Sequence, residues 1–294
     1  MKRLRLVELL ILIFLLALLC ISTLYRKKIP DISLLLSIYL CLIAFQVLLI
    51  LLKDKVPNLV HDIIFPLIVV ITVFDSLGGL VHYVNPVDID PILIRLDYLL
   101  FGGHPTLMLE SITHPLLTEL LQVSYSTYYF IPLSLGIALK IKGMEDEFQR
   151  FLFLIIFCFF LSYVGYILMP ALGPRFTIKH EVPLSGLFLA TPIQELLNRL
   201  EGIKRDAFPS GHTAVALLVV FLSRRYVRGL FYVLMPITAL LLFSTVYMRY
   251  HYVVDVIAGV GLTVVTVVIG ERYYDLYMRM RKNITGLDSR HLSS

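Results

Sequence analysis

Long uninterrupted apolar runs constrain this chain more than any other feature. The stretches 32–52 and 59–84 are each longer than the roughly 18 apolar residues that a helix needs to span a bilayer. Composition agrees, because 58% of the 294 residues are hydrophobic and only 16% are charged. Inside lipid, backbone groups must find partners within the segment, which favours helices. The sequence therefore predicts an all-α fold, a polytopic membrane helical bundle.

We expect about eight transmembrane helices plus one short interfacial helix. The predicted spans are 6–25, 32–52, 59–84, 116–139, 151–169, 209–222, 230–246 and 252–269. In the segment 91–101, apolar residues could form one face of a helix that lies on the membrane. We divide the chain into an N-terminal transmembrane hairpin (1–57), a catalytic membrane domain (58–271) and a basic cytoplasmic tail (272–294).

The basic residues lie mostly in short loops beside apolar runs, where topology signals and contacts with lipid headgroups are expected. The net charge of +5 therefore does not indicate nucleic acid as a partner. Arg224, Arg225 and Arg228 favour a cytoplasmic loop after the sixth span, whereas the basic cluster 26–28 argues against this orientation. We predict a multi-pass protein of the cell membrane, with its active site on the extracytoplasmic side.

Two sets of residues favour packing over chemistry. The three cysteines, Cys20, Cys41 and Cys158, lie in apolar runs without the spacing of metal ligands, so neither a metal site nor a disulfide is expected. Tyr125 and Tyr128, inside the fourth predicted span, are interpreted as packing residues or anchors at the membrane interface.

An ionisable pair stands at the start of the last predicted span. His251 and Asp255 are four residues apart, so on a helix they would share a face and could touch. A carboxylate bonded to one imidazole nitrogen fixes the tautomer and makes the other nitrogen a better nucleophile. A histidine merely satisfied by an acid is the alternative. However, an ionisable pair in an apolar helix is costly and usually functional, so we predict a catalytic role.

A second motif, Pro-Ser-Gly-His at 209–212, opens the sixth predicted span. Ser210 is a favourable helix N-cap, the N–H groups after it lack helical partners, and the helix dipole favours an anion there. Gly211 lets a phosphate approach the backbone closely. An ordinary capped helix start is the alternative, but the pairing of this motif with His251 and Asp255 favours phosphate chemistry.

Basic residues accompany both motifs. Arg175 follows a Gly-Pro turn just outside the fifth span, where its guanidinium could hold two phosphate oxygens. Arg205 directly precedes Asp206 and is either a phosphate ligand or the partner of that aspartate. We predict that phosphate is bound by Arg175, Ser210, Gly211, Arg249 and Arg205.

The motifs at 209–212 and 251–255 resemble the second and third signature motifs of the type-2 phosphatidic acid phosphatase superfamily. The resemblance covers about residues 88–259. It implies that His251 attacks phosphorus and forms a phosphohistidine, and that Asp255 orients His251. It also implies that His212 is the general acid that protonates the leaving alkoxide, with neither a metal nor another cofactor.

Two departures from the family pattern indicate a branch. The first motif usually begins with a lysine, but Leu168 stands in that place, with Arg175 at the end of the only match. The third motif usually begins Ser-Arg, but a Ser-Thr pair stands at 244–245, and we expect Arg249 to supply the missing charge. This pattern and the segment 96–102 resemble the branch that contains inositol phosphorylceramide synthases.

Three functions follow as hypotheses. The first is an integral membrane lipid-phosphate phosphatase at the extracytoplasmic face, with a lipid phosphate as substrate. The second is a phosphotransferase that moves a phosphorylated headgroup to an alcohol acceptor, since either water or an alcohol can attack a phosphohistidine. The third is a non-enzymatic lipid transporter, because such proteins also carry ionisable pairs on membrane helices.

Overall fold

The computed structural model describes residues 4–200 and 203–291, and within these ranges the chain forms helices and loops but no strand. The α-helices are α1 (Leu6–Leu24), α2 (Ile32–Leu51), α3 (Phe65–Leu77), α4 (Val81–Val84), α5 (Asp90–Phe101), α6 (Pro105–Met108), α7 (Pro115–Ser126), α8 (Ile131–Ile141), α9 (Glu145–Leu168), α10 (Pro174–Thr177), α11 (Ala190–Leu200), α12 (Gly211–Tyr226), α13 (Arg228–Tyr247), α14 (Val253–Val265) and α15 (Glu271–His291). Short π-helical turns are η1 (Val60–Ile64) and η4 (Thr266–Gly270), and 3₁₀ turns are η2 (Leu109–Ile112) and η3 (Thr127–Tyr129). The all-α prediction is confirmed.

Six helical segments in the described part of the chain are long and apolar enough to cross a membrane. They are Leu6–Leu24, Ile32–Leu51, Val60–Leu77, Glu145–Leu168, Arg228–Tyr247 and Val253–Asn283. Each overlaps a predicted span, although the third ends before the predicted 84 and the last continues past the predicted 269. Together they make this a multi-pass membrane protein. The total of eight spans stays a prediction.

The fourth predicted span, 116–139, is not one continuous helix. The chain forms α7, the single turn η3 and then α8, which is 11 residues long. Pro132 lies in the first turn of α8. Proline suits this place because it has no N–H to donate, and in a helix interior its ring would clash with the preceding turn. The apolar run is therefore interrupted, and Pro132 stands just after the break.

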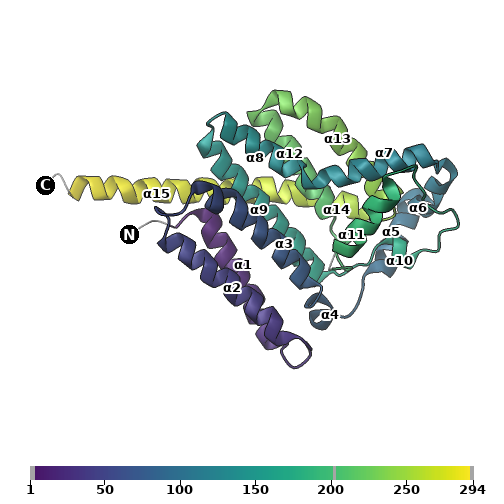
Figure 1. The fold of residues 1–294 in the computed structure, drawn as a ribbon, viewed down its shortest axis with the longest axis horizontal. Helices are drawn as coiled ribbons and strands as arrows, with labels where there is room; N and C mark the ends of the chain where they lie inside the picture. The colour runs from purple at the N-terminus through teal and green to yellow at the C-terminus, as the bar shows by residue number, and fades with distance from the viewer. Residues whose placement is uncertain (1–3, 201–202, 292–294) are drawn as a thin grey trace.

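The sixth predicted span is α12, a helix of 16 residues near the middle of the bundle. Figure 1 shows it surrounded by α8, α9, α13 and α14, and it contacts all four. Ala214, Leu218 and Leu222 are fully buried along its length. Because α12 is enclosed by other helices, its two ends are fixed relative to them.

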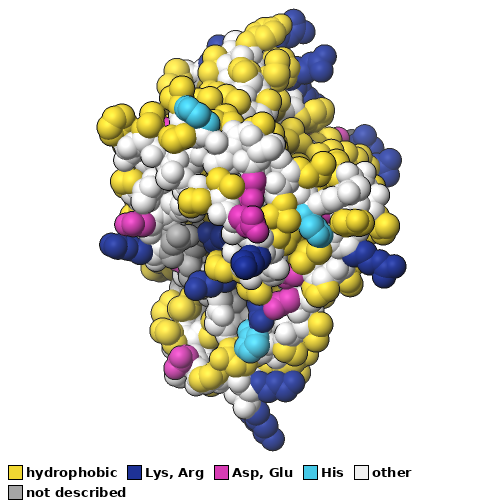
Figure 2. Space-filling model, turned by 90° about the vertical axis from the view of Figure 1, so that its right-hand side faces the viewer, with side chains coloured by type: hydrophobic (Ala, Val, Ile, Leu, Met, Phe, Trp, Pro, Cys, Tyr) yellow, Lys and Arg dark blue, Asp and Glu magenta, His cyan; other side chains and the backbone are white. Residues whose placement is uncertain are grey.

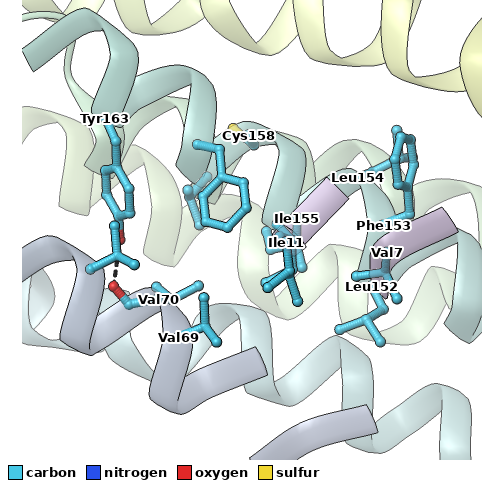
Figure 3. Close-up of a cluster of buried hydrophobic side chains, with 14 of the residues drawn as sticks. Val7, Ile11, Val69, Val70, Leu152, Phe153, Leu154, Ile155, Cys158 and Tyr163 are labelled. Atoms are coloured by element: carbon cyan, nitrogen blue, oxygen red, sulfur yellow. Dashed lines mark hydrogen bonds between the residues drawn. The ribbon is translucent and has the colours of Figure 1, made fainter. Parts of the chain in front are cut away.

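Helices α1, α3 and α9 form the core beside α12 (Figure 3). Ile11 of α1 and Val69 of α3 are buried with Ile155 of α9. Tyr163 of α9 donates its hydroxyl to Val70 O at 2.9 Å, which satisfies a buried polar group. These contacts join the N-terminal hairpin to the rest of the bundle.

Ion pairs gather at the end of the bundle that carries the N-terminus. Asp62 pairs with Arg5 and, at 2.6 Å, with Lys140 in the last turn of α8. Arg225, at the end of α12, pairs with Glu271 at 2.8 Å. The start of α12 therefore lies at the opposite end of the bundle from the N-terminus, as Figure 1 also shows.

The interfacial helix predicted at 91–101 is present as α5. Ile92, Leu99 and Leu100 are exposed, whereas Leu93 is buried. The helix lies at the same end of the molecule as the start of α12 (Figure 1). Its location on a membrane surface stays a prediction.

Candidate active site

Three segments that are distant in the sequence meet at the start of α12. They are residues 170–175 after α9, 206–212 before and within α12, and 249–255 before and within α14. Backbone hydrogen bonds that join them run from Ala207 N to Ala171 O (3.1 Å), from Arg175 N to Arg249 O (3.0 Å) and from Ser210 N to Asp255 O (3.1 Å). The predicted site residues are thus carried on segments that contact one another directly.

The two histidines of the predicted motifs face each other. Nδ1 of His212 lies 3.3 Å from Nε2 of His251, and the rings meet edge to face with centroids 5.5 Å apart. His212 belongs to the first turn of α12, while His251 lies in the turn just before α14. The structure therefore brings together two imidazoles that are 39 residues apart in the sequence.

The tautomer of His251 follows from its other ring nitrogen. Nδ1 lies 2.8 Å from the carbonyl oxygen of Ala207. A carbonyl can only accept, so Nδ1 carries the proton and, in the neutral ring, Nε2 carries the lone pair. The nitrogen that faces His212 is thus the nucleophilic one. Sequence reasoning missed Ala207, because a backbone carbonyl gives no side-chain signal.

Asp255 approaches His251 by a different route from the one the spacing indicated. Its Oδ2 lies 3.5 Å from Nδ1 of His251, but that histidine precedes α14 and does not share a helical face with the aspartate. Oδ2 also accepts from the N–H of Tyr252 at 2.9 Å, which caps the helix. Oδ1 has no hydrogen-bond partner among the described residues. The carboxylate can therefore stabilise positive charge on the imidazole.

Ser210 is the N-cap of α12, as the sequence predicts. Its Oγ accepts from Thr213 N at 3.3 Å and from Thr213 Oγ1 at 3.1 Å, and the side chain is fully buried. Gly259 of α14 lies against the same helix start, because a Cβ at that position would be 2.6 Å from Ser210 O. The start of α12 is therefore held in place by both its cap and its neighbour.

Arg175, in α10, lies over the aromatic ring of the residue that directly precedes His251. Its guanidinium carbon is 4.9 Å from the centre of the Tyr250 ring. It also interacts electrostatically with Asp206, whose carboxyl interacts with His251 as well. Burial raises the pKa of Asp206 and outweighs the lowering effect of these two charges. The charges of Arg175 and His251 thus both act on the Asp206 carboxyl.

The other two predicted phosphate ligands each meet an acidic side chain. Arg249 donates from Nη2 to Glu110 Oε1 at 3.0 Å and to Val182 O at 2.5 Å. Arg205 pairs with both carboxylate oxygens of Asp88, at 2.8 and 2.9 Å. These contacts direct both guanidinium groups to protein carboxylates, and phosphate binding by them stays a prediction.

Aromatic rings surround His212. The ring centres of Tyr125 and Tyr128 lie 4.8 and 4.2 Å from that of His212, and Tyr250 stacks on Tyr125 at 4.3 Å. The sequence interpretation of Tyr125 and Tyr128 as packing residues is therefore incomplete, because both also contact a candidate catalytic side chain. Tyr125 lies in the last turn of α7 and Tyr128 in η3, the turn that separates α7 from α8.

Figure 2 shows the end of the molecule that carries α5, α6 and α10. Lysine, arginine, acidic and histidine side chains gather near the middle of this face, between hydrophobic side chains. Within the part of the chain that the structure describes, no three His, Cys, Asp or Glu side chains are arranged to hold a metal ion.

Fold and site together define a helical membrane protein in which the starts of two helices bring two histidines and an aspartate together. Residues 92–269, more than half of the chain, match the PAP2 superfamily, and the chain belongs to it. This membership supports a phosphatase- or phosphotransferase-type function.

A PA-phosphatase related-family protein from Dictyostelium discoideum is 24% identical over 186 residues. That match covers 56% of this chain and 34% of the relative, so the chain spans about a third of the length of this curated protein. No solved structure matches the chain significantly.

Proposed function

We propose that this protein hydrolyses lipid phosphates through a phosphohistidine at His251. The observation that carries the proposal is the contact of His251 Nε2 with His212 Nδ1 at 3.3 Å, while Ala207 holds the other nitrogen of His251. The nucleophilic nitrogen of His251 and the proton donor of His212 then face each other, and the phosphoryl group would enter between the two rings.

The reaction has two steps. The lone pair of His251 Nε2 attacks phosphorus, and the bond from phosphorus to the lipid oxygen breaks as His212 gives that oxygen a proton. Water then attacks the phosphohistidine, His212 takes a proton from it, and inorganic phosphate leaves. Asp255, 3.5 Å from Nδ1, stabilises the positive charge that the ring carries between the two steps.

Phosphate binding is assigned to the start of α12 and to Arg175. The dipole at the start of α12 attracts an anion. The missing side chain of Gly211 leaves room for the hydroxyl of Tyr166 in α9, so its place in a phosphate site rests on its backbone alone. Arg175 adds a guanidinium beside Tyr250. Arg249 and Arg205 would join these groups only by leaving Glu110 and Asp88.

The place of the site supports the proposed substrate and the proposed side of the membrane. The site lies at an end of the bundle, where α5 exposes Ile92, Leu99 and Leu100, so a lipid could keep its tails in the bilayer while its phosphate reaches His251. The N-terminus lies at the other end with Arg224 and Arg225, which favours a cytoplasmic location for that end. We therefore propose that the site faces the extracytoplasmic side of the cell membrane.

The test is phosphate release by purified protein from a panel of lipid phosphomonoesters and diphosphates. We expect His251→Ala to abolish release. The control is His180→Gln, which changes a histidine in the loop after α10 that contacts Thr106 at 3.1 Å, and it should keep wild-type activity. Undiminished activity of His251→Ala would overturn the proposal, and so would failure to trap a phosphohistidine in the wild type.

A lipid phosphotransferase related to inositol phosphorylceramide synthases is the second candidate. The observation that favours it is the departure from the family motifs, because Leu168 stands where the first motif has a lysine and a Ser-Thr pair at 244–245 where the third has Ser-Arg. Thin-layer chromatography after incubation with a radiolabelled donor lipid and candidate alcohols separates the two reactions. Only the transferase makes a labelled lipid product. A transporter would form no phosphohistidine at all.

A further inference from the structure

Two buried aspartates lie on α5, a helix that carries none of the predicted catalytic residues. Asp90 is 3% exposed and Asp97 is 2% exposed. They are seven residues apart, so they lie on one face of the helix, about 10 Å apart along its axis. A buried carboxylate is costly unless it is hydrogen bonded, so the partners of these two groups indicate what they are for.

Asp97 binds the beginning of α14. Its Oδ2 accepts from Val253 N at 3.0 Å and its Oδ1 from Val254 N at 2.9 Å. These are the first two residues of the helix, whose N–H groups have no partner within it. The carboxylate charge also suits the positive end of the helix dipole. Asp97 thus fixes the orientation of the turn that holds His251 and of the helix that holds Asp255.

Asp90 binds the loop that precedes Arg175. Its Oδ2 accepts from Leu172 N and its Oδ1 from Gly173 N, both at 2.9 Å. The hydroxyl of Tyr252 donates to Oδ1 as well, at 2.8 Å. Because Tyr252 directly follows His251, one carboxylate ties the loop of the candidate phosphate ligand to the turn of the candidate nucleophile.

Leu93, which lies between the two aspartates on α5, adds an apolar contact with the same segments. Leu93 is buried, and it belongs to a small core with Ala171, Ala207 and Tyr252. Ala207 is the residue whose carbonyl accepts from His251. One face of α5 therefore contacts all three segments that converge at the histidine pair, and it does so with a single rigid element.

We propose that Asp90 and Asp97 are positioning residues for the reaction, which hold the Arg175 loop and the His251 turn in register through α5. This inference rests on the proposed function. Neither carboxylate touches the histidines directly in the structure, so each acts through the backbone it binds. Misplacing a reacting group by about 1 Å can cost about 100-fold in rate, which sets the scale of the expected effect.

The experiment compares Asp97→Asn, Asp97→Glu and Asp90→Asn with the wild type. An asparagine keeps one acceptor but turns an N–H group toward the second backbone donor. We expect kcat to fall about 10- to 100-fold with KM changed less than about 3-fold, because geometry is lost and substrate binding is not. Asp97→Glu keeps both acceptors and should recover part of kcat. Arg95→Gln, an exposed change on the same helix, is the matched control and should behave as the wild type.

Turnover is expressed per active site, counted by the burst of trapped phosphohistidine. Loss of folded protein lowers the burst but leaves kcat per site unchanged. A lower burst with an unchanged kcat in Asp97→Asn would therefore indicate a purely structural role of Asp97 and would overturn the inference. Wild-type kcat in Asp97→Asn, beside a His251-dependent wild type, would overturn the inference alone. A wild type without His251-dependent turnover would overturn the proposed function and this inference with it.

Discussion

Gly259 of α14 lies directly against the backbone carbonyl of Ser210 at the start of α12. A Cβ at Gly259 would come to 2.6 Å from Ser210 O and 2.7 Å from Thr213 Cβ, distances that no relaxed structure holds. Ser210 N also donates to Asp255 O at 3.1 Å. The two helices that carry His212 and Asp255 thus approach each other at this point as closely as a glycine allows.

Gly259→Ala should therefore separate the two motifs. The methyl group would push α14 away from α12 and lengthen the contact between His212 and His251. Overpacking of this kind costs about 1–3 kcal/mol. We expect a lower thermal midpoint in detergent and a fall in kcat of at least 10-fold, measured by phosphate release from the preferred lipid phosphate.

Gly261→Ala is the matched control, two residues further along the same helix. A Cβ there meets nothing within 4 Å, so the same chemical change should leave activity and thermal midpoint near those of the wild type. Equal behaviour of the two variants would contradict the role assigned to the close approach at Gly259.

The loss of activity on replacing His212 should be larger for a substrate with a poorer leaving group. A general acid contributes about 100- to 10,000-fold by protonating the departing oxygen. We expect His212→Ala to lose activity on this scale with an alkyl phosphate lipid. An analogue with a nitrophenolate leaving group needs no proton, so its loss should be below about 10-fold. Equal losses with both substrates, measured as kcat/KM, would assign His212 a different role.

Arg249 and Glu110 should behave as one unit. Their side chains are 12% and 14% exposed and pair at 3.0 Å. We expect Arg249→Gln and Glu110→Gln to lower the thermal midpoint by similar amounts. The double variant should be little worse than either, because contacting residues couple by about 0.5–3 kcal/mol. A rise in KM that occurs only in Arg249→Gln would instead indicate that Arg249 binds the substrate phosphate.

The sequence located the helices well where lipid or tight burial demands continuous apolar residues. The bounds of α2 and α13 lie within two residues of the predicted spans. The prediction of one continuous helix over 116–139 was wrong. Hydropathy indicates whether a segment lies in lipid or in water, but not whether its helix is continuous. Thr127–Tyr129 is a 3₁₀ turn between two helices, and aromatic residues on both sides conceal it. Pro132 was the available signal of a break.

The candidate site, too, could be predicted from the sequence only in part. Side chains whose chemistry is conspicuous, such as His212 and His251, could be picked from motifs and spacing. The groups that hold them could not, because their partners are backbone atoms far along the chain. Ala207 accepts from His251 across 44 residues, and Asp97 binds Val253 across 156. Such pairs become visible only when the helices are assembled.

Asp206 should make stability fall as pH rises. Burial raises its pKa in the folded protein, whereas an unfolded chain releases this proton at about pH 3.9. Between those two values the folded state binds more protons than the unfolded state, so the free energy of unfolding decreases with increasing pH and levels off above the raised pKa. Asp206→Asn cannot ionise and lacks this decrease. Thermal unfolding in detergent from pH 4 upward should therefore show the midpoint of Asp206→Asn rising relative to the wild type through this window and then running parallel to it. If the midpoint of Asp206→Asn instead falls relative to the wild type as the pH rises, the interaction of Asp206 with Arg175 and His251 outweighs its burial.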